Sequence, residues 1–299
     1  MSFNSSINNP LVSVLMTAYN RENYIAEAIE SVLASTYTNF ELIIVDDGSV
    51  DNTVHIARNY EQSDSRIKVF VNENNLGDYP NRNRAASYAV GEYLKYLDAD
   101  DTIYRHGLEV MVNYMIKYPE AAFALSLHLI DDIKPYPFLI NSVDIIRSEY
   151  MYRSYLSAGP SASIIKKDAF EAVGGFSGKQ YVGDTELWLK LASKYSIVVM
   201  NPSLIWYRSH PDQQIKIEYK KPQILIDRLK ISIEYLLLNK NYFSESEFTY
   251  AIKKRKQHFS RMVFSILIRR RNLNKFIYLL KNSGLNLSDW LSGFRGYYK

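Results

Sequence analysis

The chain has 299 residues, of which 47% are hydrophobic and 23% charged, as in an ordinary globular protein of one large domain or of a domain with an appendage. It contains no cysteine, which excludes disulfides and thiolate metal sites. No segment approaches the roughly 18 uninterrupted apolar residues of a membrane span, and residues 1–10 lack the layout of a signal peptide. We therefore expect a cytoplasmic protein, or one that is peripheral at the inner face of the plasma membrane.

The net charge of +4 hides an asymmetry along the chain. Residues 211–299 hold 18 basic and 7 acidic side chains, whereas the first 210 residues hold 18 basic and 25 acidic ones. An acidic body followed by a basic region indicates two different tasks. We expect a flexible N-terminus at 1–10, an α/β domain at 11–215 and a basic helical region at 216–299.

Strand and helix patterns alternate through the first hundred residues. Apolar runs typical of buried strands stand at 11–16, 41–45, 66–71 and 93–97, and apolar residues at helical spacing lie at 22–33, 51–60 and 81–90. This alternation predicts a parallel sheet with right-handed crossover helices, in which ligands bind at the carboxyl ends of the strands.

The second half of the chain continues with less regular patterns. We expect a helix at 108–118, a strand at 121–129, a loop-rich insertion at 131–160, a strand at 163–165, helices at 167–173 and 185–195, and strands at 197–200 and 204–208. Beyond His210 the pattern becomes wholly helical, at 222–238, 245–268 and 274–280. The insertion carries several prolines and is predicted to lie beside the ligand site.

Polar clusters follow three of the predicted strands, at 17–20, 46–49 and 98–101. The last cluster holds three carboxylates, which repel one another unless a cation lies between them. A divalent metal carrying a phosphate ester would meet that need, because hard cations prefer carboxylate oxygen. An acidic loop or a helix N-cap is the alternative.

Four blocks in this order, residues 12–20, 40–53, 81–101 and 173–191, resemble the family 2 glycosyltransferases. Those are inverting enzymes with the GT-A nucleotide-diphospho-sugar transferase fold, a Rossmann-like mixed α/β sheet flanked by helices. The resemblance covers about residues 11–210, so the chain would carry a C-terminal helical extension. It implies a glycosyltransferase (EC 2.4) of bacterial surface polysaccharide synthesis. The donor would be a nucleotide diphosphate sugar, in the first place a UDP-sugar, and the acceptor a hydroxyl of a glycan or lipid-linked glycan. Because the Gln-x-x-Arg-Trp motif of processive synthases is absent, we expect transfer of a single sugar.

The resemblance also implies which residues bind the nucleotide: Thr17, Ala18, Tyr19, Asp47, Arg82 and Asp98. Tyr19 would pack on the base, Asp47 would bind the uracil or thymine edge, and Asp98 would reach the ribose. Arg82 would neutralise the diphosphate or meet an acidic partner. A solvated helix charge for Arg82 and a surface aromatic for Tyr19 are the structural alternatives.

The segment Asp98-Ala99-Asp100 matches the family's DxD motif, whose last Asp holds Mn²⁺ or Mg²⁺. The resemblance implies Asp100, Asp101 and His210 as candidate metal ligands. Asp101 could instead cap a turn, and His210 could be structural. The metal would stabilise the leaving nucleoside diphosphate as a Lewis acid.

Asp184 matches the catalytic base of the family's "ED" motif, which takes the proton of the acceptor hydroxyl. The Glu that usually precedes it is Gly183 here, so Glu186 remains an alternative base. This departure keeps open a non-catalytic sugar-nucleotide-binding or scaffold protein. A nucleotidyltransferase is less favoured, because no Gly-rich basic loop follows the first strand.

The basic C-terminal region contains the runs 253–256 and 269–271, with apolar residues between them at helical spacing. Such a helix could contact a membrane surface, or it could pack on the catalytic domain or in a homo-oligomer. Nucleic acid is not expected as a partner, because charge clusters alone do not identify such binding.

Overall fold

The computed structural model describes residues 9–127, 134–210 and 221–295, in two compact units. The first unit consists of Met1–Ile145 and Tyr155–Arg208, and the second of Ile146–Ser154 and Ser209–Lys299. Most of the predicted flexible N-terminus lies outside the described residues, as does the end of the strand predicted at 121–129.

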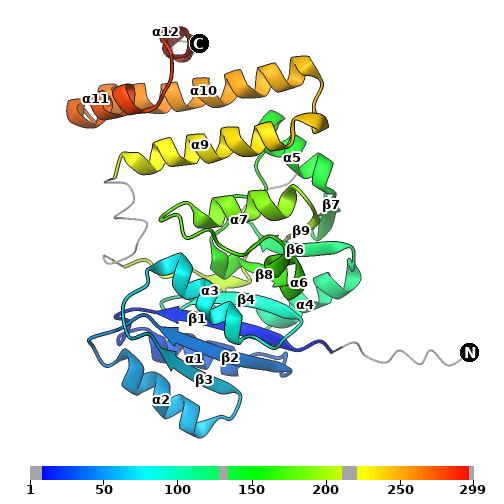
Figure 1. Ribbon diagram of the computed structural model, residues 1–299. Helices are drawn as coiled ribbons and strands as arrows, with labels where there is room; N and C mark the ends of the chain where they lie inside the picture. The colour runs from blue at the N-terminus through cyan, green and yellow to red at the C-terminus, as the bar shows by residue number, and fades with distance from the viewer. Residues whose placement is uncertain (1–8, 128–133, 211–220, 296–299) are drawn as a thin grey trace, which may run out of the picture. The chain divides into compact units, whose positions relative to one another are not determined.

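The first unit is built on an eight-stranded mixed sheet (Figure 1). In spatial order its strands are β3 (Ile67–Val71), β2 (Phe40–Asp46), β1 (Val12–Ala18), β4 (Tyr93–Asp98), β8 (Ser163–Lys166), β6 (Ala121–Ser126), β9 (Ser196–Met200) and β7 (Phe138–Ile140). The predicted parallel pairing is confirmed for β1 with β2, β2 with β3 and β1 with β4. Strand β8 runs antiparallel to β4 and β6, which makes the whole sheet mixed. Two short strands, β5 (Thr102–Ile103) and β10 (Ile205–Trp206), form a separate antiparallel pair.

Helices cover the sheet of the first unit. They are α1 (Ile25–Leu33), α2 (Thr53–Ser63), α3 (Asp78–Tyr88), α4 (Gly107–Lys117), α6 (Lys167–Ala172) and α7 (Gly183–Ala192), with a 3-10 turn, η1 (Pro160–Ala162). Helix α1 packs on α2, and α3 lies on the opposite face of β1 and β2 (Figure 1). Because both faces are covered, every residue from Val12 to Met16 is buried, which explains why this strand is mostly apolar.

The insertion predicted to be irregular at 131–160 contains strand β7 and a helix, α5 (Ser142–Met151). The expectation of a loop was wrong over these segments, because it gave most weight to the prolines. A usable signal stands at the start of the helix: the side-chain oxygen of Asn141 accepts a hydrogen bond from the backbone N–H of Asp144 at 2.8 Å.

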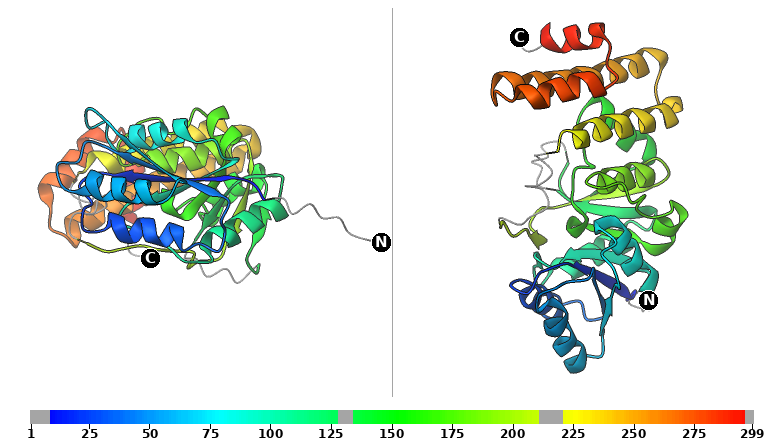
Figure 2. Two further views of the ribbon diagram at one scale, coloured as in Figure 1. Left: turned by 90° about the horizontal axis from the view of Figure 1, so that it is seen from below. Right: turned by 60° about the vertical axis from the view of Figure 1, so that its left-hand side comes forward.

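The second unit is a helical bundle of α9 (Gln223–Leu238), α10 (Glu245–Ile268), α11 (Leu273–Asn282) and α12 (Leu287–Arg295), with a 3-10 turn, η2 (Lys240–Tyr242). Helices α9 and α10 run antiparallel side by side (Figures 1 and 2). Ser244 and Glu247 form a reciprocal capping box at the start of α10. Helix α12 was not predicted, and it packs on α10 through Trp290.

Three of the four basic side chains at 253–256 of α10 bind partners within the second unit. Lys254 Nζ donates to the Met151 carbonyl at 2.7 Å, Arg255 pairs with Glu149 at 2.8 Å, and Lys256 pairs with Asp289 at 3.0 Å. Phe259, Val263 and Ile266, on the apolar face of the same helix, are buried in the bundle core. The idea that α10 offers this face to a membrane was therefore wrong. Among the described residues, no helix combines the length and the apolar character that crossing a bilayer requires.

Candidate active site

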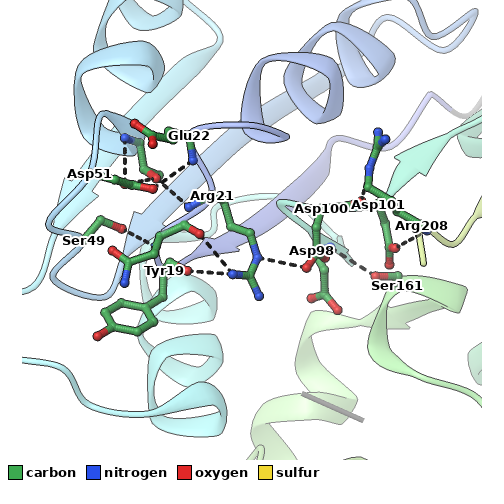
Figure 3. A network of polar contacts seen from close by, with 12 residues as sticks. Tyr19, Arg21, Glu22, Ser49, Asp51, Asp98, Asp100, Asp101, Ser161 and Arg208 are labelled. Carbon is green, nitrogen blue, oxygen red and sulfur yellow. Dashed lines mark hydrogen bonds and ion pairs between the residues drawn. The ribbon is translucent and has the colours of Figure 1, made fainter. Parts of the chain in front are cut away.

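Three polar loops meet at the carboxyl ends of the neighbouring strands β2, β1 and β4. The strand register brings them together, because Thr17 lies opposite Asp98 in β4 and Ala18 lies opposite Asp46 in β2. Figure 3 shows the side chains of this edge, with Tyr19 and Arg21 on one side and the acidic cluster on the other. The predicted convergence of the clusters at 17–20, 46–49 and 98–101 is confirmed.

The turn after β2 uses its two aspartates differently. Asp46 accepts hydrogen bonds from the backbone N–H groups of Gly48, at 3.1 Å, and Ser49, at 2.7 Å, and so holds the turn in which Gly48 adopts a φ of +80°. Asp47 is buried and accepts from Asn72 Nδ2 and from two backbone N–H groups at 76 and 77, at 2.7–2.9 Å. Asp47 thus fixes the loop that follows β3, and its contact with a base stays a prediction.

The loop after β1 leaves the ring of Tyr19 exposed, at 46% of its surface. The next residue, Asn20, has a φ of +52°, and its backbone N–H donates to Ser49 Oγ at 2.8 Å. The carbonyl of Ala18 accepts from the Asp47 backbone N–H at 2.8 Å, and Thr17 is half-buried. The loop is therefore held on both sides of Tyr19, while its ring remains open to a ligand.

The acidic cluster at the end of β4 has the donor set of a divalent-cation site. Asp98, Asp100 and Asp101 each offer a carboxylate oxygen, and these oxygens lie within 4.8 Å of one another. Burial and the neighbouring Asp98 and Asp100 charges raise the pKa of Asp101 to about 7. Three hard oxygen donors at this spacing fit Mg²⁺ or Mn²⁺.

Two arginines that the sequence did not single out contact this cluster. Arg21 Nε donates to Asp100 Oδ2 at 2.9 Å, and the backbone N–H of Arg208 donates to Asp101 Oδ1 at 3.2 Å (Figure 3). Arg21 also donates to the Tyr19 carbonyl at 3.0 Å. Its position directly after the 17–20 cluster is the signal that could have identified it.

Arg82, on the first turns of α3, is buried with 5% of its surface exposed. Its Nε lies 2.7 Å from Asp78 Oδ1 and its Nη2 lies 2.7 Å from Asp98 Oδ1. The alternative of a solvated helix charge is therefore wrong. The remaining nitrogen, Nη1, is buried and has no hydrogen-bond partner among the described residues. A buried guanidinium donor without an acceptor fits a site for an anionic ligand group.

Lys95, on β4, is fully buried close to the acidic cluster. Lys95 Nζ donates to the carbonyls of Tyr96 and Ser161, and its burial lowers its pKa to about 7, although Asp98 and Asp101 oppose the shift. The hydroxyl of Ser161 in turn accepts from the backbone N–H of Asp98 at 3.1 Å. These contacts join η1 to β4 below the acidic residues.

Asp184 lies at the start of α7, beside the first turn of α3. Its charge raises the pKa of Tyr79 and contributes to the raised pKa of Asp78, although burial is the larger cause for both groups. Since Asp78 pairs with Arg82, the predicted base belongs to the same polar network as Asp98.

Tyr79 also explains the departure at position 183. The ring of Tyr79 is buried and stacks on Phe176, with 5.1 Å between ring centroids. A Cβ at Gly183 would lie 2.7–2.8 Å from three ring carbons of Tyr79, closer than such contacts occur. The ring of Tyr79 from α3 thus fills the space into which a side chain at position 183 would extend.

Glu186, the alternative base, is buried and has both oxygens engaged. It accepts a hydrogen bond from Ser177 Oγ and pairs with Lys179 Nζ at 2.8 Å. These contacts tie the loop before α7 to the helix. They favour a structural role for Glu186 and leave Asp184 as the candidate base.

His210 is buried, and it follows the division between the two units. The cluster of potential metal ligands in the described part of the chain consists of the three aspartates. A ligand role for His210 stays a prediction.

The sequence profile described as Glycosyl transferase family 2 matches residues 13–173, which is more than half of the chain. Among curated proteins, UDP-Glc:alpha-D-GlcNAc-diphosphoundecaprenol beta-1,3-glucosyltransferase WfgD of Escherichia coli is 44% identical over 107 residues, or 36% of this chain and 42% of WfgD. An uncharacterized glycosyltransferase of Haemophilus influenzae is 40% identical over 111 residues, or 37% of this chain and 44% of that protein. The matched segments thus span less than half the length of these relatives.

Solved structures resemble the chain over almost its whole length. TarS of S. aureus in complex with UDP has a TM-score of 0.66 at 18% identity, covering 96% of this chain and 88% of that one. Mannosyltransferase PcManGT of Pyrobaculum calidifontis in complex with GDP-Man and Mn²⁺ has a TM-score of 0.60 at 16% identity, covering 98% and 81%. By sequence profile and by architecture, the chain belongs to glycosyl transferase family 2 and has the GT-A fold that its motifs predicted.

Proposed function

We propose that the chain transfers a single sugar, with inversion and in the presence of Mn²⁺ or Mg²⁺, from a UDP-sugar to a hydroxyl of a glycan or lipid-linked glycan in surface polysaccharide synthesis. The observation that carries this proposal is the position of Arg82. Its guanidinium pairs with Asp98 of the acidic cluster and with Asp78, whose pKa the charge of Asp184 helps to raise. The named UDP-Glc-dependent relative and the UDP complex of TarS support the choice of donor and pathway.

In the proposed complex the nucleotide lies along the edge of β1 and β2. Tyr19 stacks on the base, Thr17 and Ala18 line the strand end, and Asp98 binds the ribose. Arg82 meets a diphosphate oxygen through its unpartnered Nη1. Asp47 contacts the base edge once the loop at 72–77 shifts, because its oxygens are occupied by that loop.

Asp100 is the proposed principal ligand of the divalent cation, with Asp101 beside it and His210 as a further ligand. When bound, the cation supplies Lewis-acid stabilisation of the charge on the leaving nucleoside diphosphate. Arg21 must leave Asp100 for this arrangement, because its guanidinium already pairs with that carboxylate at 2.9 Å. A cationic side chain released there remains available to the diphosphate.

Asp184 is the proposed general base. Its carboxylate takes the proton of the acceptor hydroxyl as that oxygen attacks the anomeric carbon from the side opposite the leaving group. Asp184 is half-buried and lies beside the buried ring of Tyr79 and near the Asp78 carboxylate. The neighbouring Glu186 holds the loop at 177–179 in place.

The test compares donor binding and turnover with and without the metal. Thermal shift across UDP-, dTDP- and GDP-sugars, in Mn²⁺ or in EDTA, identifies the donor, and release of the nucleoside diphosphate then measures turnover. We expect Mn²⁺-dependent stabilisation by UDP-sugars that is lost in Asp100→Ala. It should persist in Glu120→Ala, which removes an exposed carboxylate in the turn between α4 and β6. Donor binding without any turnover would instead support a non-catalytic sugar-nucleotide-binding protein.

A further inference from the structure

Helix α11 carries more apolar surface than the bundle covers. Its inner side packs through Leu279, which is fully buried, and through Phe276, whose ring lies 5.8 Å from that of Phe264. Three further apolar side chains remain exposed: Leu273 at 55%, Ile277 at 38% and Leu280 at 41%. At 3.6 residues per turn these three point within about 60° of one another, so they form one stripe along the helix.

The flanks of this stripe are strongly basic. Residues 269–282 contain five basic side chains, Arg269, Arg270, Arg271, Lys275 and Lys281, and no acidic one. Arg270 and Arg271 are exposed and form no ion pair with any described residue. Burial and the charge of the nearby Arg270 lower the pKa of Lys275.

These side chains contrast with the basic run of α10. There, Lys254, Arg255 and Lys256 are held by Met151, Glu149 and Asp289 within the bundle. By contrast, Arg270 and Arg271 at the end of α10 and Lys281 on α11 are exposed, directly beside the apolar stripe. An apolar stripe flanked by such charges matches the interfacial region of an anionic bilayer, where acyl chains lie beneath negative headgroups.

We propose that the α11 surface, defined as Arg270, Arg271, Leu273, Ile277, Leu280 and Lys281, binds the face of a membrane that contains anionic phospholipid. The apolar stripe enters the headgroup boundary and the cations pair with lipid phosphates. A second copy of the chain is a poorer occupant, because an isologous contact would place these cations against one another. This proposal does not depend on the sugar or on the acceptor.

The test uses the full-length protein and co-sedimentation with vesicles of phosphatidylcholine alone or mixed with phosphatidylglycerol. We expect binding only to the anionic vesicles, weakening as salt rises. The double variant Arg270→Glu/Arg271→Glu should lower the partition coefficient by roughly tenfold or more, since each basic residue contributes about 1 kcal/mol. Ile277→Ser/Leu280→Ser should lower it at every salt concentration.

Matched controls alter equivalent side chains elsewhere on the second unit. Lys230→Glu/Lys253→Glu makes the same charge change at exposed positions of α9 and α10, and Leu237→Ser/Leu238→Ser removes exposed apolar side chains of α9. Both should bind vesicles as the parent protein does, and circular dichroism should show all variants folded. Three outcomes would overturn the proposal: no vesicle binding by the parent protein, equal losses in the controls, or light scattering that shows a dimer which Ile277→Ser/Leu280→Ser dissociates.

Discussion

The ring of Tyr79 occupies the space that a side chain at position 183 would need, because a Cβ on Gly183 would lie 2.7 Å from Tyr79 Cδ2. The two positions belong to different helices, α3 and α7, and Asp184 follows directly in the sequence. The contact therefore fixes how close the start of α7 comes to α3. It gives a steric reason for the glycine at position 183, and the role of Asp184 as the base stays a prediction.

Gly183→Ala should be destabilising, because the added methyl group must displace a buried ring. We expect a loss of about 1–3 kcal/mol, the usual cost of overpacking a core. In a Tyr79→Ala background the same substitution should cost much less, since the colliding ring is gone. Urea unfolding of the four proteins in this cycle measures the coupling, and equal costs in both backgrounds would contradict the steric explanation.

Asp184→Asn should abolish most of the transfer while donor binding stays nearly unchanged. Loss of a general base costs about 10²–10⁴-fold in turnover, and the amide keeps the size of the carboxylate. Glu186→Gln is the matched variant: it weakens the contact with Lys179 and should lower stability more than turnover. Isothermal titration with the donor and steady-state rates separate the effects. A reversed ranking of the two rates would move the base to Glu186.

Arg21→Ala should increase the affinity of the acidic cluster for Mn²⁺ in the absence of nucleotide. The Arg21 guanidinium lies 2.9 Å from the Asp100 carboxylate and competes with the metal for it. Removing an ion pair worth about 1 kcal/mol should lower the dissociation constant for Mn²⁺ about fivefold. Electron paramagnetic resonance of free Mn²⁺ measures this directly. Arg66→Ala, which breaks the ion pair with Asp64 on the same unit, is the control and should leave the affinity unchanged. Weaker binding in Arg21→Ala would show that Arg21 supports the metal site instead of competing for it.

Lys95 should make stability depend on pH between 7 and 9. Its pKa in the folded protein, about 7, lies below the ordinary 10.5. The unfolded chain therefore binds more protons in this range, and the folded state gains stability as the pH rises. One pKa unit corresponds to about 1.4 kcal/mol, so the gain is of the order of 2 kcal/mol.

The Lys95→Met variant should lack this gain, because methionine does not titrate. Urea unfolding at pH 7, 8 and 9 provides the measurement. Lys68→Met, at an exposed position of β3, should keep the full pH dependence of the parent protein. Parallel pH profiles for the parent and Lys95→Met would rule out a depressed pKa for this lysine.

The first half of the fold could be predicted because its strands are mostly apolar, and a polar cluster follows three of them. Val12–Met16 and its neighbours carry that pattern in the sequence itself. Helix α5 was missed because the prolines of the segment 131–160 were given most weight, whereas partners far away in the sequence stabilise the helix. Tyr150, for example, donates to the Ser232 carbonyl at 2.8 Å, a contact across 82 positions.

The candidate site was predictable only in part, for a similar reason. The motif positions identified Asp98, Asp100 and Arg82 one by one. The ring of Tyr79 fills the space of a side chain at position 183, and Arg21 pairs with Asp100. The first relation depends on how closely α3 approaches α7, and the second on how closely the loop after β1 approaches the loop after β4. No spacing along the chain encodes those distances.

The attachment of Ile146–Ser154 to the second unit bears on how the protein can be shortened. Arg147 pairs with Glu247 of α10, and Arg255 of the same helix pairs with Glu149. A fragment that stops before α9 would therefore retain half of a helix whose ion-pair and hydrogen-bond partners had been cut away. Expression of the N-terminal domain alone is better attempted with Arg147, Glu149 and Tyr150 replaced by small polar residues than by a single cut near residue 215.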